Sequence, residues 1–340
     1  MQRLDDYRAA MLAVFSETPD EVLEDNLQQR GSNFVSFVVD YGLGPLWHVR
    51  TGLDEFRESR MVSESLFLVH VDALKHIDTV LGSADIPYVV IKGAANRLLL
   101  YDNPAVRACH DIDLLVHPDD RVRAANALIE YGYSSAPKPQ NISHQLELTS
   151  GAVTIDLHWG LLREGRLRTQ PVADMLARRR RVGDVWVLDA TDTLFLLLVH
   201  PAFAKHLGAW DMGLHRVADI ADWLREFDAN WPEVCRILEL NGVSTAAWAT
   251  LRWLQLLAPA SMSQQLEKLM ADVRPGPLRR AYLDYWLENN LSARTSGVHI
   301  IRLLGFSIFM HDRPSDALRA FRGRSRAHRR QAEDLAAFSA

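Results

Sequence analysis

The sequence contains very little cysteine. Its 340 residues include only two, Cys109 and Cys235, which lie far apart in the chain. Two separated cysteines provide neither a disulfide framework nor a cysteine-based metal cluster, so a reduced setting is expected. Long apolar runs are also missing. The longest, 194–199 and 303–310, are far too short to cross a bilayer, and the N-terminus has no apolar signal region. These absences predict a cytoplasmic protein that is not bound to a membrane.

Charge of one sign is not in excess either. The chain has 38 Lys and Arg against 43 Asp and Glu, a formal net charge of −5. This balance creates no overall attraction for nucleic acid, which is the partner class we least expect. The basic run 178–181 and the basic tail 319–330 are predicted to be solvated rather than to contact phosphate or RNA. The length allows a large core, in two domains or in one domain with additions.

Two aspartates open the most informative stretch of the sequence. Asp111 and Asp113 are separated by one residue and lead into the run 112–116, which is otherwise apolar. Alternate side chains of a β-strand share a face, so these two carboxylates would project together. Two carboxylates at such a short distance repel each other unless a cation lies between them, and hard oxygen ligands suit Mg²⁺. The pattern therefore indicates a metal site at the mouth of a strand.

A predicted strand and a glycine turn come before this pair. Residues 1–85 are expected to be helical, 86–91 to form a buried strand, and 94–101 to form a helix. Between the strand and the helix, Lys92-Gly93 would expose N–H groups at a helix N-terminus, which favours an anion such as phosphate. The alternative is that Gly93 merely permits a tight turn. The dipeptide alone favours that alternative.

A third carboxylate lies on a predicted hairpin over 145–159, with its turn at Ser150-Gly151. The second arm of this hairpin separates its apolar and polar residues onto opposite faces, Val153, Ile155 and Leu157 against Thr154, Asp156 and His158. Asp156 is thus a polar residue on a core strand. It joins Asp111 and Asp113 as a candidate for the same chemistry.

The remaining segments are predicted to be loops and helices. Loops are expected at 102–104 and 134–142, and between them a helix that Asp119 caps and Gly132 closes. From about residue 170 the chain is expected to be helical again. The helices predicted there include a buried one over 194–199 that ends near His200-Pro201, and amphipathic ones over 214–227 and 248–257.

Three histidines in this later part raise the question of a second metal. His200, His206 and His215 do not have the spacing of a ligand pair on one helix face, and no cysteine joins them. Core or surface histidines are therefore predicted in preference to a zinc site.

Several enzyme classes use paired carboxylates. Haloacid-dehalogenase phosphatases and many glycosyltransferases carry an Asp-x-Asp motif, but there the apolar strand precedes the first aspartate, whereas here it follows. A glycosidase pair would not need neighbouring carboxylates or Lys92-Gly93. The order of the motifs argues against the first two classes, whereas a glycosidase remains possible in principle.

The combined motifs resemble one known family. They are Ile91-Lys92-Gly93, then Arg107 with Asp-Ile-Asp-Leu-Leu-Val at 111–116, then Val-Thr-Ile-Asp-Leu-His-Trp at 153–159. Together they are similar to the uncharacterised bacterial nucleotidyltransferase family, a branch of the DNA polymerase beta-like superfamily, over roughly residues 30–260. In the wider superfamily a Gly-Ser pair opens the helix that holds the triphosphate, whereas this chain has Lys92-Gly93 and no serine beside it.

This resemblance implies an α+β fold, a small mixed sheet flanked by helices. The corresponding regions are an N-terminal helical region 1–85, a catalytic core 86–170 and a C-terminal helical region 171–340. The implied metal-binding and catalytic residues are Asp111, Asp113 and Asp156, holding two Mg²⁺ ions that Mn²⁺ could replace. The implied nucleotide-binding residues are Lys92, Gly93 and Arg107. Arg107 would either contact phosphate or hold its loop.

The implied activity is Mg²⁺-dependent transfer of a nucleoside monophosphate from a triphosphate such as ATP, with release of pyrophosphate. The acceptor would be a hydroxyl or phosphate group of a small molecule, a peptide or a protein. Two alternatives remain open at this point, a catalytically silent nucleotide-binding or regulatory module and a γ-phosphotransferase on the same fold. His158 would either support the metal site or pack against Trp159.

Overall fold

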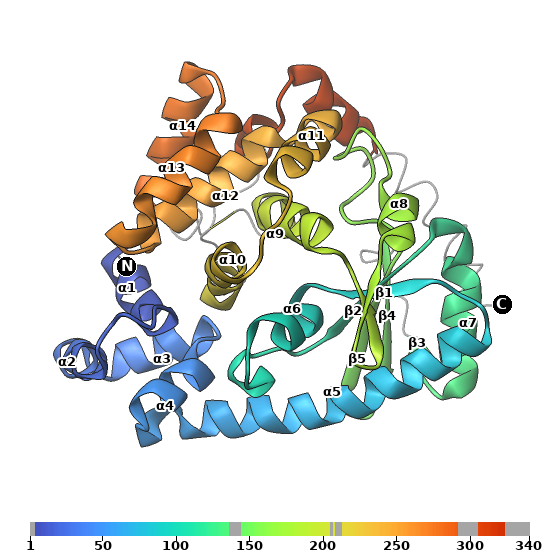
Figure 1. Cartoon of the computed structure of the whole chain (residues 1–340), viewed down its shortest axis with the longest axis horizontal. Helices are drawn as coiled ribbons and strands as arrows, with labels where there is room; N and C mark the ends of the chain where they lie inside the picture. Colours follow the sequence, from blue (N-terminus) through green and yellow to red (C-terminus); the bar gives the residue numbers. More distant parts are fainter. Residues whose placement is uncertain (1–3, 136–143, 205–206, 208–212, 292–304, 324–340) are drawn as a thin grey trace.

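The computed structural model describes residues 4–135, 144–204, 207, 213–291 and 305–323. It is an α+β structure in which one seven-stranded mixed sheet is flanked by helices (Figure 1). The expected fold class is therefore confirmed. Across the described ranges, no helix combines the length and the apolar character that crossing a membrane requires.

The N-terminal region is helical, as predicted. Its α-helices are α1 (Leu4–Met11), α2 (Asp20–Arg30), α3 (Ser32–Asp40), α4 (Gly44–Thr51) and α5 (Arg57–Ser83). The long helix α5 runs from the N-terminal cluster to the sheet (Figure 1). Its buried residues Ala73, Leu74, Ile77 and Leu81 recur at the helical period and pack against the sheet. This helix therefore anchors the N-terminal cluster to the strands that carry the aspartates.

The sheet has the order β3-β4-β5-β2-β1-β7-β6. Its strands are β1 (Tyr88–Ile91), β2 (Ile112–Val116), β3 (Ser134–Ser135), β4 (Gln145–Ser150), β5 (Val153–His158), β6 (Arg180–Val182) and β7 (Val185–Val187). Strand β2 is central, antiparallel to β1 and parallel to β5. The predicted hairpin is confirmed as β4 and β5, but its turn lies at Gly151-Ala152, one residue later than expected.

Two sequence expectations about the sheet are wrong. Residues 134–135 form the short edge strand β3 rather than loop, and the rest of the segment, 136–143, lies outside the described residues. Residues 180–187 form a hairpin, β6 and β7, instead of helix, and β7 pairs in parallel with β1. Two arms of three residues are too short to show an alternating pattern, which explains why the sequence did not reveal them.

The described helices after β1 are α6 (Lys92–Leu100), α7 (Arg121–Tyr131), α8 (Val172–Ala177), α9 (Ala190–Ala204), α10 (Leu214–Glu226), α11 (Trp231–Asn241), α12 (Ser244–Leu257), α13 (Ser263–Asp272) and α14 (Pro277–Glu288). Residues 305–309 and 314–323 are also helical. The predicted end of α9 at His200-Pro201 is wrong, because the helix continues through Pro201 to Ala204. Burial of Ala202 and Phe203 holds this last turn in place although Pro201 donates no hydrogen bond.

Two smaller details also differ from expectation. Asp119 does not cap α7. His117 caps the 3-10 turn Pro118–Asp120, since its Nδ1 accepts a hydrogen bond from the Asp119 N–H, and Asp120 stands at the N-cap position of α7 without a side-chain cap bond. The basic run 178–181 was expected to be solvated, but it is paired, and its last two residues belong to the edge strand β6. Arg178 binds Asp192, and Arg181 binds Asp78.

Two apolar clusters enclose the sheet from opposite sides. Val90 and Leu114 point to the cluster that contains α5 and α7, together with Val153, Ile155 and Leu157 of β5. Their neighbours Ile91 and Leu115 point to the larger cluster, which contains α9, α10 and α12. Because side chains alternate, Asp113 and Asp156 face the second side, toward α9 and α10. The face separation predicted for β5 is confirmed.

Two buried histidines outside the sheet make stability sensitive to acid. Burial lowers the pKa of His70 to about 4 and that of His311 to about 3. Unfolded histidine titrates near 6.5, so between these values the unfolded chain binds more protons and stability falls as pH falls. By pH 4 each should cost on the order of 3 kcal/mol. Urea unfolding from pH 7 to pH 4 should show this loss, and His70→Gln should reduce it. Identical pH profiles for both proteins would contradict the assignment.

Candidate functional site

The candidate site begins with the register of two central strands. Strands β2 and β5 are parallel neighbours, and Asp113 lies directly beside Asp156. His158 follows on the same face of β5. Asp113, Asp156 and His158 each offer one ligand atom, and these atoms all lie within 4.8 Å of one another. Residues that are far apart in the chain thus meet in a group that could hold a metal ion.

Lys92 lies beside this group. Its Nζ donates a hydrogen bond of 2.6 Å to Oδ1 of Asp113, and it lies 3.0 Å from Nε2 of His158. The same Nε2 lies 2.7 Å from Oδ1 of Asp113. The Lys92 ammonium therefore compensates the Asp113 charge. A metal ion bound to Asp113 would compete with this ammonium for the carboxylate oxygen.

The surroundings shift the pKa values of the neighbouring carboxyl groups of Asp113 and Asp156 in opposite directions. Burial opposes ionisation of Asp113, but Lys92 and His158 outweigh it and hold the pKa of Asp113 well below its usual range. Burial and the charges of Asp113 and Asp111 raise the pKa of Asp156 to about 7. Asp156 also accepts a hydrogen bond of 2.8 Å from Gln145. One carboxylate is thus firmly ionised, whereas its neighbour can hold a proton near neutral pH.

Asp111 and His158 complete the titrating groups. Asp111 precedes β2 and is not in the three-residue group, but it lines the same cavity, and burial followed by the Asp113 charge raises its pKa. Burial and Lys92 lower the pKa of His158 to about 4, so its ring is neutral. Oxygen donors from Asp111, Asp113 and Asp156 fit Mg²⁺ or Mn²⁺, and a neutral imidazole fits Mn²⁺ as well.

Two cavities meet at these residues. The first, here called the carboxylate cavity, has a volume of about 300 Å³ and contains Asp156 together with Gln145, Arg163, Arg166 and His200. The second, here called the helix-side cavity, has a volume of about 700 Å³ and lies between α5 and the 107–113 segment. Both are lined by Lys92, Asp111, Asp113 and Arg216. Two ligands could therefore approach the carboxylates from different sides.

The turn before α6 explains why Gly93 is glycine. Lys92 has a φ of +55°, in the left-handed region, whereas Gly93 does not. A Cβ on Gly93 would lie 2.9 Å from Nη1 of Arg107 and 2.9 Å from Sγ of Cys109. The space beside the Cα of Gly93 is therefore occupied by side chains of the protein itself. Its contact with phosphate stays a prediction.

Substituting Gly93 should consequently destabilise the protein even without a ligand. For Gly93→Ala we expect a loss of about 1–3 kcal/mol, the usual cost of overpacking, because the Arg107 guanidinium must move. Urea unfolding of the nucleotide-free protein measures this. Gly82→Ala is a matched control, since nothing lies within 4 Å of a Cβ placed there. Equal midpoints for Gly93→Ala and the wild type would contradict the packing argument.

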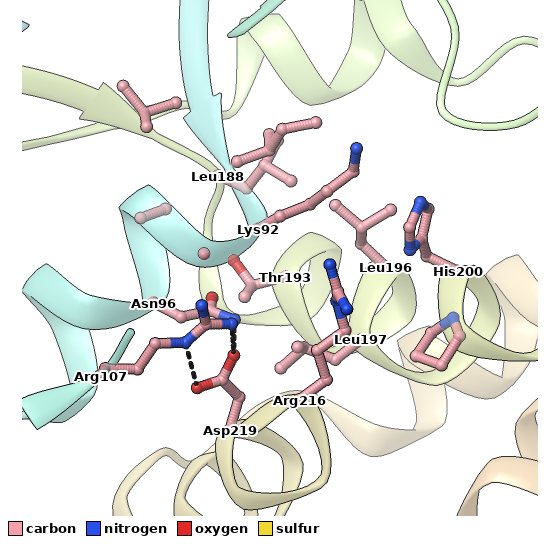
Figure 2. Close-up of a pocket in the computed structure, with 15 residues that line it drawn as sticks. Lys92, Asn96, Arg107, Leu188, Thr193, Leu196, Leu197, His200, Arg216 and Asp219 are labelled. Carbon is pink, nitrogen blue, oxygen red and sulfur yellow. Dashed lines mark hydrogen bonds and ion pairs between the residues drawn. The ribbon is translucent and has the colours of Figure 1, made fainter. Parts of the chain in front are cut away.

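Arg107 is held by a buried ion pair with α10. Its Nε and Nη2 donate to the two carboxylate oxygens of Asp219 at 3.2 and 2.6 Å, and Nη1 donates to the Ala108 carbonyl at 2.5 Å (Figure 2). Burial alone would lower the pKa of Arg107, but Asp219 outweighs it and raises that pKa. Asn96 and Tyr101 also donate to Asp219. These contacts support the role of Arg107 in holding its loop.

Sequence reasoning missed the arginine that does face both cavities. Arg216 follows His215 on α10, and Figure 2 shows its side chain beside Lys92 and His200, on the side away from the Arg107–Asp219 pair. Burial and the neighbouring Arg107 lower the pKa of Arg216. Its position three residues before Asp219 was visible, but only the packing of α10 against α6 shows that it faces the aspartates.

Two of the three histidines considered for a second metal lie in the described part of the chain. His200 lines the carboxylate cavity, whereas Nδ1 of His215 bonds the Tyr41 carbonyl at 3.3 Å. His206 lies outside the described residues.

One comparison with known proteins identifies relatives of this chain. A family model described as "Uncharacterised nucleotidyltransferase" matches residues 50–259, more than half of the chain. The matched range spans the three aspartates, Lys92, Arg107 and Arg216. No curated protein matches the chain.

Proposed function

Because the chain belongs to the uncharacterised nucleotidyltransferase family, we propose that it transfers a nucleoside monophosphate from a nucleoside triphosphate to an acceptor oxygen, releasing pyrophosphate. The observation that carries the proposal is the pairing of Asp113 with Asp156 in register, with Asp111 on the same cavity. Three carboxylates around one point suit a reaction in which divalent metal ions must be held. Two Mg²⁺ ions would polarise the α-phosphorus and stabilise the attacking and leaving oxygens.

The side chains then take distinct roles. Asp111 and Asp113 would hold the metals, with Asp113 ionised throughout the neutral range. Asp156 would complete the metal site and accept the acceptor's proton. Lys92 and Arg216 would stabilise the charge on the departing pyrophosphate. Arg107, joined to Asp219, would fix the segment that leads into the aspartates.

A catalytically silent nucleotide-binding module is the second candidate. The observation that favours it is the Lys92–Asp113 ion pair, which neutralises a metal-binding carboxylate internally. In such a protein the triphosphate would bind without turnover. Lys92→Ala should then leave a protein that still transfers nothing.

Label position separates these functions. The full chain is incubated with Mg²⁺, a small-molecule cell extract and a triphosphate labelled at either the α- or the γ-phosphorus. We expect α-label in a product whose mass has risen by one nucleoside monophosphate, together with free pyrophosphate. Transfer of γ-label with release of a diphosphate would instead establish a phosphotransferase. Binding without any transfer would favour the silent module.

The role of Asp156 can be tested separately. Asp156→Asn should keep nucleotide binding within a few-fold while reducing transfer by about 100-fold or more, since general base catalysis alone contributes 10²–10⁴-fold. Single-turnover rates and nucleotide affinity should be measured on the same preparation. Glu147→Gln, on the neighbouring strand β4, is the matched control. Full activity in Asp156→Asn would remove this residue from the reaction.

A further inference from the structure

Side chains of both charges line the carboxylate cavity. Asp113 and Asp156 come from the central strands, and the loop after β5 brings Arg163 and Arg166 to the same cavity. Asp113 is already paired with Lys92. His144 and His200 also line the cavity. The cavity thus offers two guanidinium groups in addition to its carboxylates.

The two cavities also divide the reacting groups. Gly93, at the start of α6, lines the helix-side cavity and not the carboxylate cavity, whereas the reverse holds for Asp156. If the triphosphate lies against Lys92-Gly93, the larger space of about 700 Å³ receives the nucleotide. The space of about 300 Å³ beside Asp156 then remains for the acceptor. That volume suits a small molecule.

We propose that the acceptor is a small anionic molecule whose carboxylate or phosphate group is bound by Arg163 and Arg166. This inference rests on the proposed nucleotidyl transfer. The acceptor oxygen forms a bond to the α-phosphorus while the bond between that phosphorus and the oxygen bridging to the β-phosphorus breaks. Pyrophosphate leaves with the bonding electrons, and the proton of an acceptor hydroxyl passes to Asp156. A planar guanidinium matches the geometry of either anionic group.

The fold holds this loop in a defined place. Gly165 lies between the two arginines with a φ of +84°, and a Cβ there would lie 2.6 Å from the Arg319 carbonyl oxygen. Arg168 donates to both carboxylate oxygens of Asp316, at 2.9 and 2.6 Å. The backbone of the C-terminal helix over 314–323 thus packs directly on the loop. Arg166 is fixed further by a 2.6 Å hydrogen bond to the Phe203 carbonyl.

Arg163 is the better residue to test, because it has no ion pair to another described residue and its removal should not disturb the fold. Three small hydroxyl compounds are titrated into the full chain saturated with Mg²⁺ and an α,β-methylene ATP analogue. They are glycerol 3-phosphate, glycerate and ethanolamine. We expect at least one of the two anions to bind and ethanolamine not to bind. The anion with the higher affinity shows whether the site prefers a phosphate or a carboxylate group.

The matched variants are Arg163→Gln and, as a control for general loss of positive charge, Arg236→Gln on α11. Arg163→Gln should weaken anion binding by about 10-fold or more, the effect of one charge-assisted hydrogen bond. Its affinity for the ATP analogue should stay within about twofold of the wild-type value. Arg236→Gln should change neither affinity.

Three results would overturn the inference. If Arg163→Gln lost as much affinity for the ATP analogue as for the anion, the arginine would be assigned to the triphosphate. Binding of ethanolamine in preference to both anions would indicate a cationic acceptor. Binding of none of the three compounds would exclude a small anion site. If the wild type fails to bind the ATP analogue at all, the proposed nucleotidyl transfer itself is contradicted, which distinguishes that failure from the other three.

Discussion

Asp113→Asn is expected to reduce metal-dependent transfer by at least about 10³-fold, because metal-bound charge stabilisation contributes several kcal/mol and each 1.4 kcal/mol is tenfold in rate. The same variant should also lower the stability of the metal-free protein. Lys92 would lose its carboxylate partner, only 2.6 Å away, inside a buried site. Initial rates and urea midpoints should therefore fall together.

The other two aspartates should behave differently in the same assays. The pKa of Asp156 is raised to about 7 in the folded metal-free protein. Between about pH 4 and pH 7 the unfolded chain therefore ionises this carboxyl more readily than the folded protein does, and the free energy of unfolding falls as pH rises. The full loss is reached above pH 7. Asp156→Asn should thus stabilise the metal-free protein at pH 8 and make little difference at pH 4. Asp111→Asn should shift stability in the same direction, since the pKa of Asp111 is also raised. All three variants should lose activity.

This contrast separates a functional site from a structural one. Loss of stability in all three variants would indicate carboxylates that serve only to hold the fold. Gain of stability with loss of activity at Asp111 and Asp156 is the pattern of a site organised for a bound cation.

The second large effect concerns stability alone. Arg107→Met should destabilise the protein by about 3–5 kcal/mol, because it leaves Asp219 as an uncompensated buried charge. Arg107 is 5% exposed and Asp219 is fully buried, so solvent screens the pair little. Urea unfolding at pH 7 measures the difference.

Two controls sharpen this prediction. The double variant Arg107→Met with Asp219→Leu should recover much of the loss, since neither charge then remains unpaired. Arg236→Ala, which breaks an exposed pair with Glu233, should leave the midpoint unchanged. If the double variant is no more stable than Arg107→Met, the two residues do not act as a pair.

Much of the site was predictable because its signals are local. The alternation over 153–158 identified the face of β5 that carries Asp156, and the apolar run 112–116 identified β2. These patterns depend only on the two-residue period of a strand. The fold class and the family followed from the same stretches.

The features of the fold and of the site that the sequence did not predict depend on tertiary packing. Nothing local to Arg107 reveals Asp219, which lies 112 residues later in the chain. Nor does the sequence show that Arg216 faces the aspartates or that Arg107 and Cys109 fill the space beside Gly93. The β6–β7 hairpin was missed because each arm has only three residues. In each case the structure depends on partners that a sequence window does not contain.

Mn²⁺ binding tests the central claim most directly, because it needs no acceptor. Electron paramagnetic resonance of free Mn²⁺ gives the number of ions bound by the full chain in the presence of the α,β-methylene ATP analogue. The wild type is expected to hold two ions in its complex with the analogue, one more than the analogue binds alone. Asp113→Asn and Asp156→Asn are each expected to lose at least one ion, whereas Glu147→Gln should keep both. Equal Mn²⁺ binding by the wild type and all three variants would contradict a metal site at these carboxylates, and with it the proposed nucleotidyl transfer.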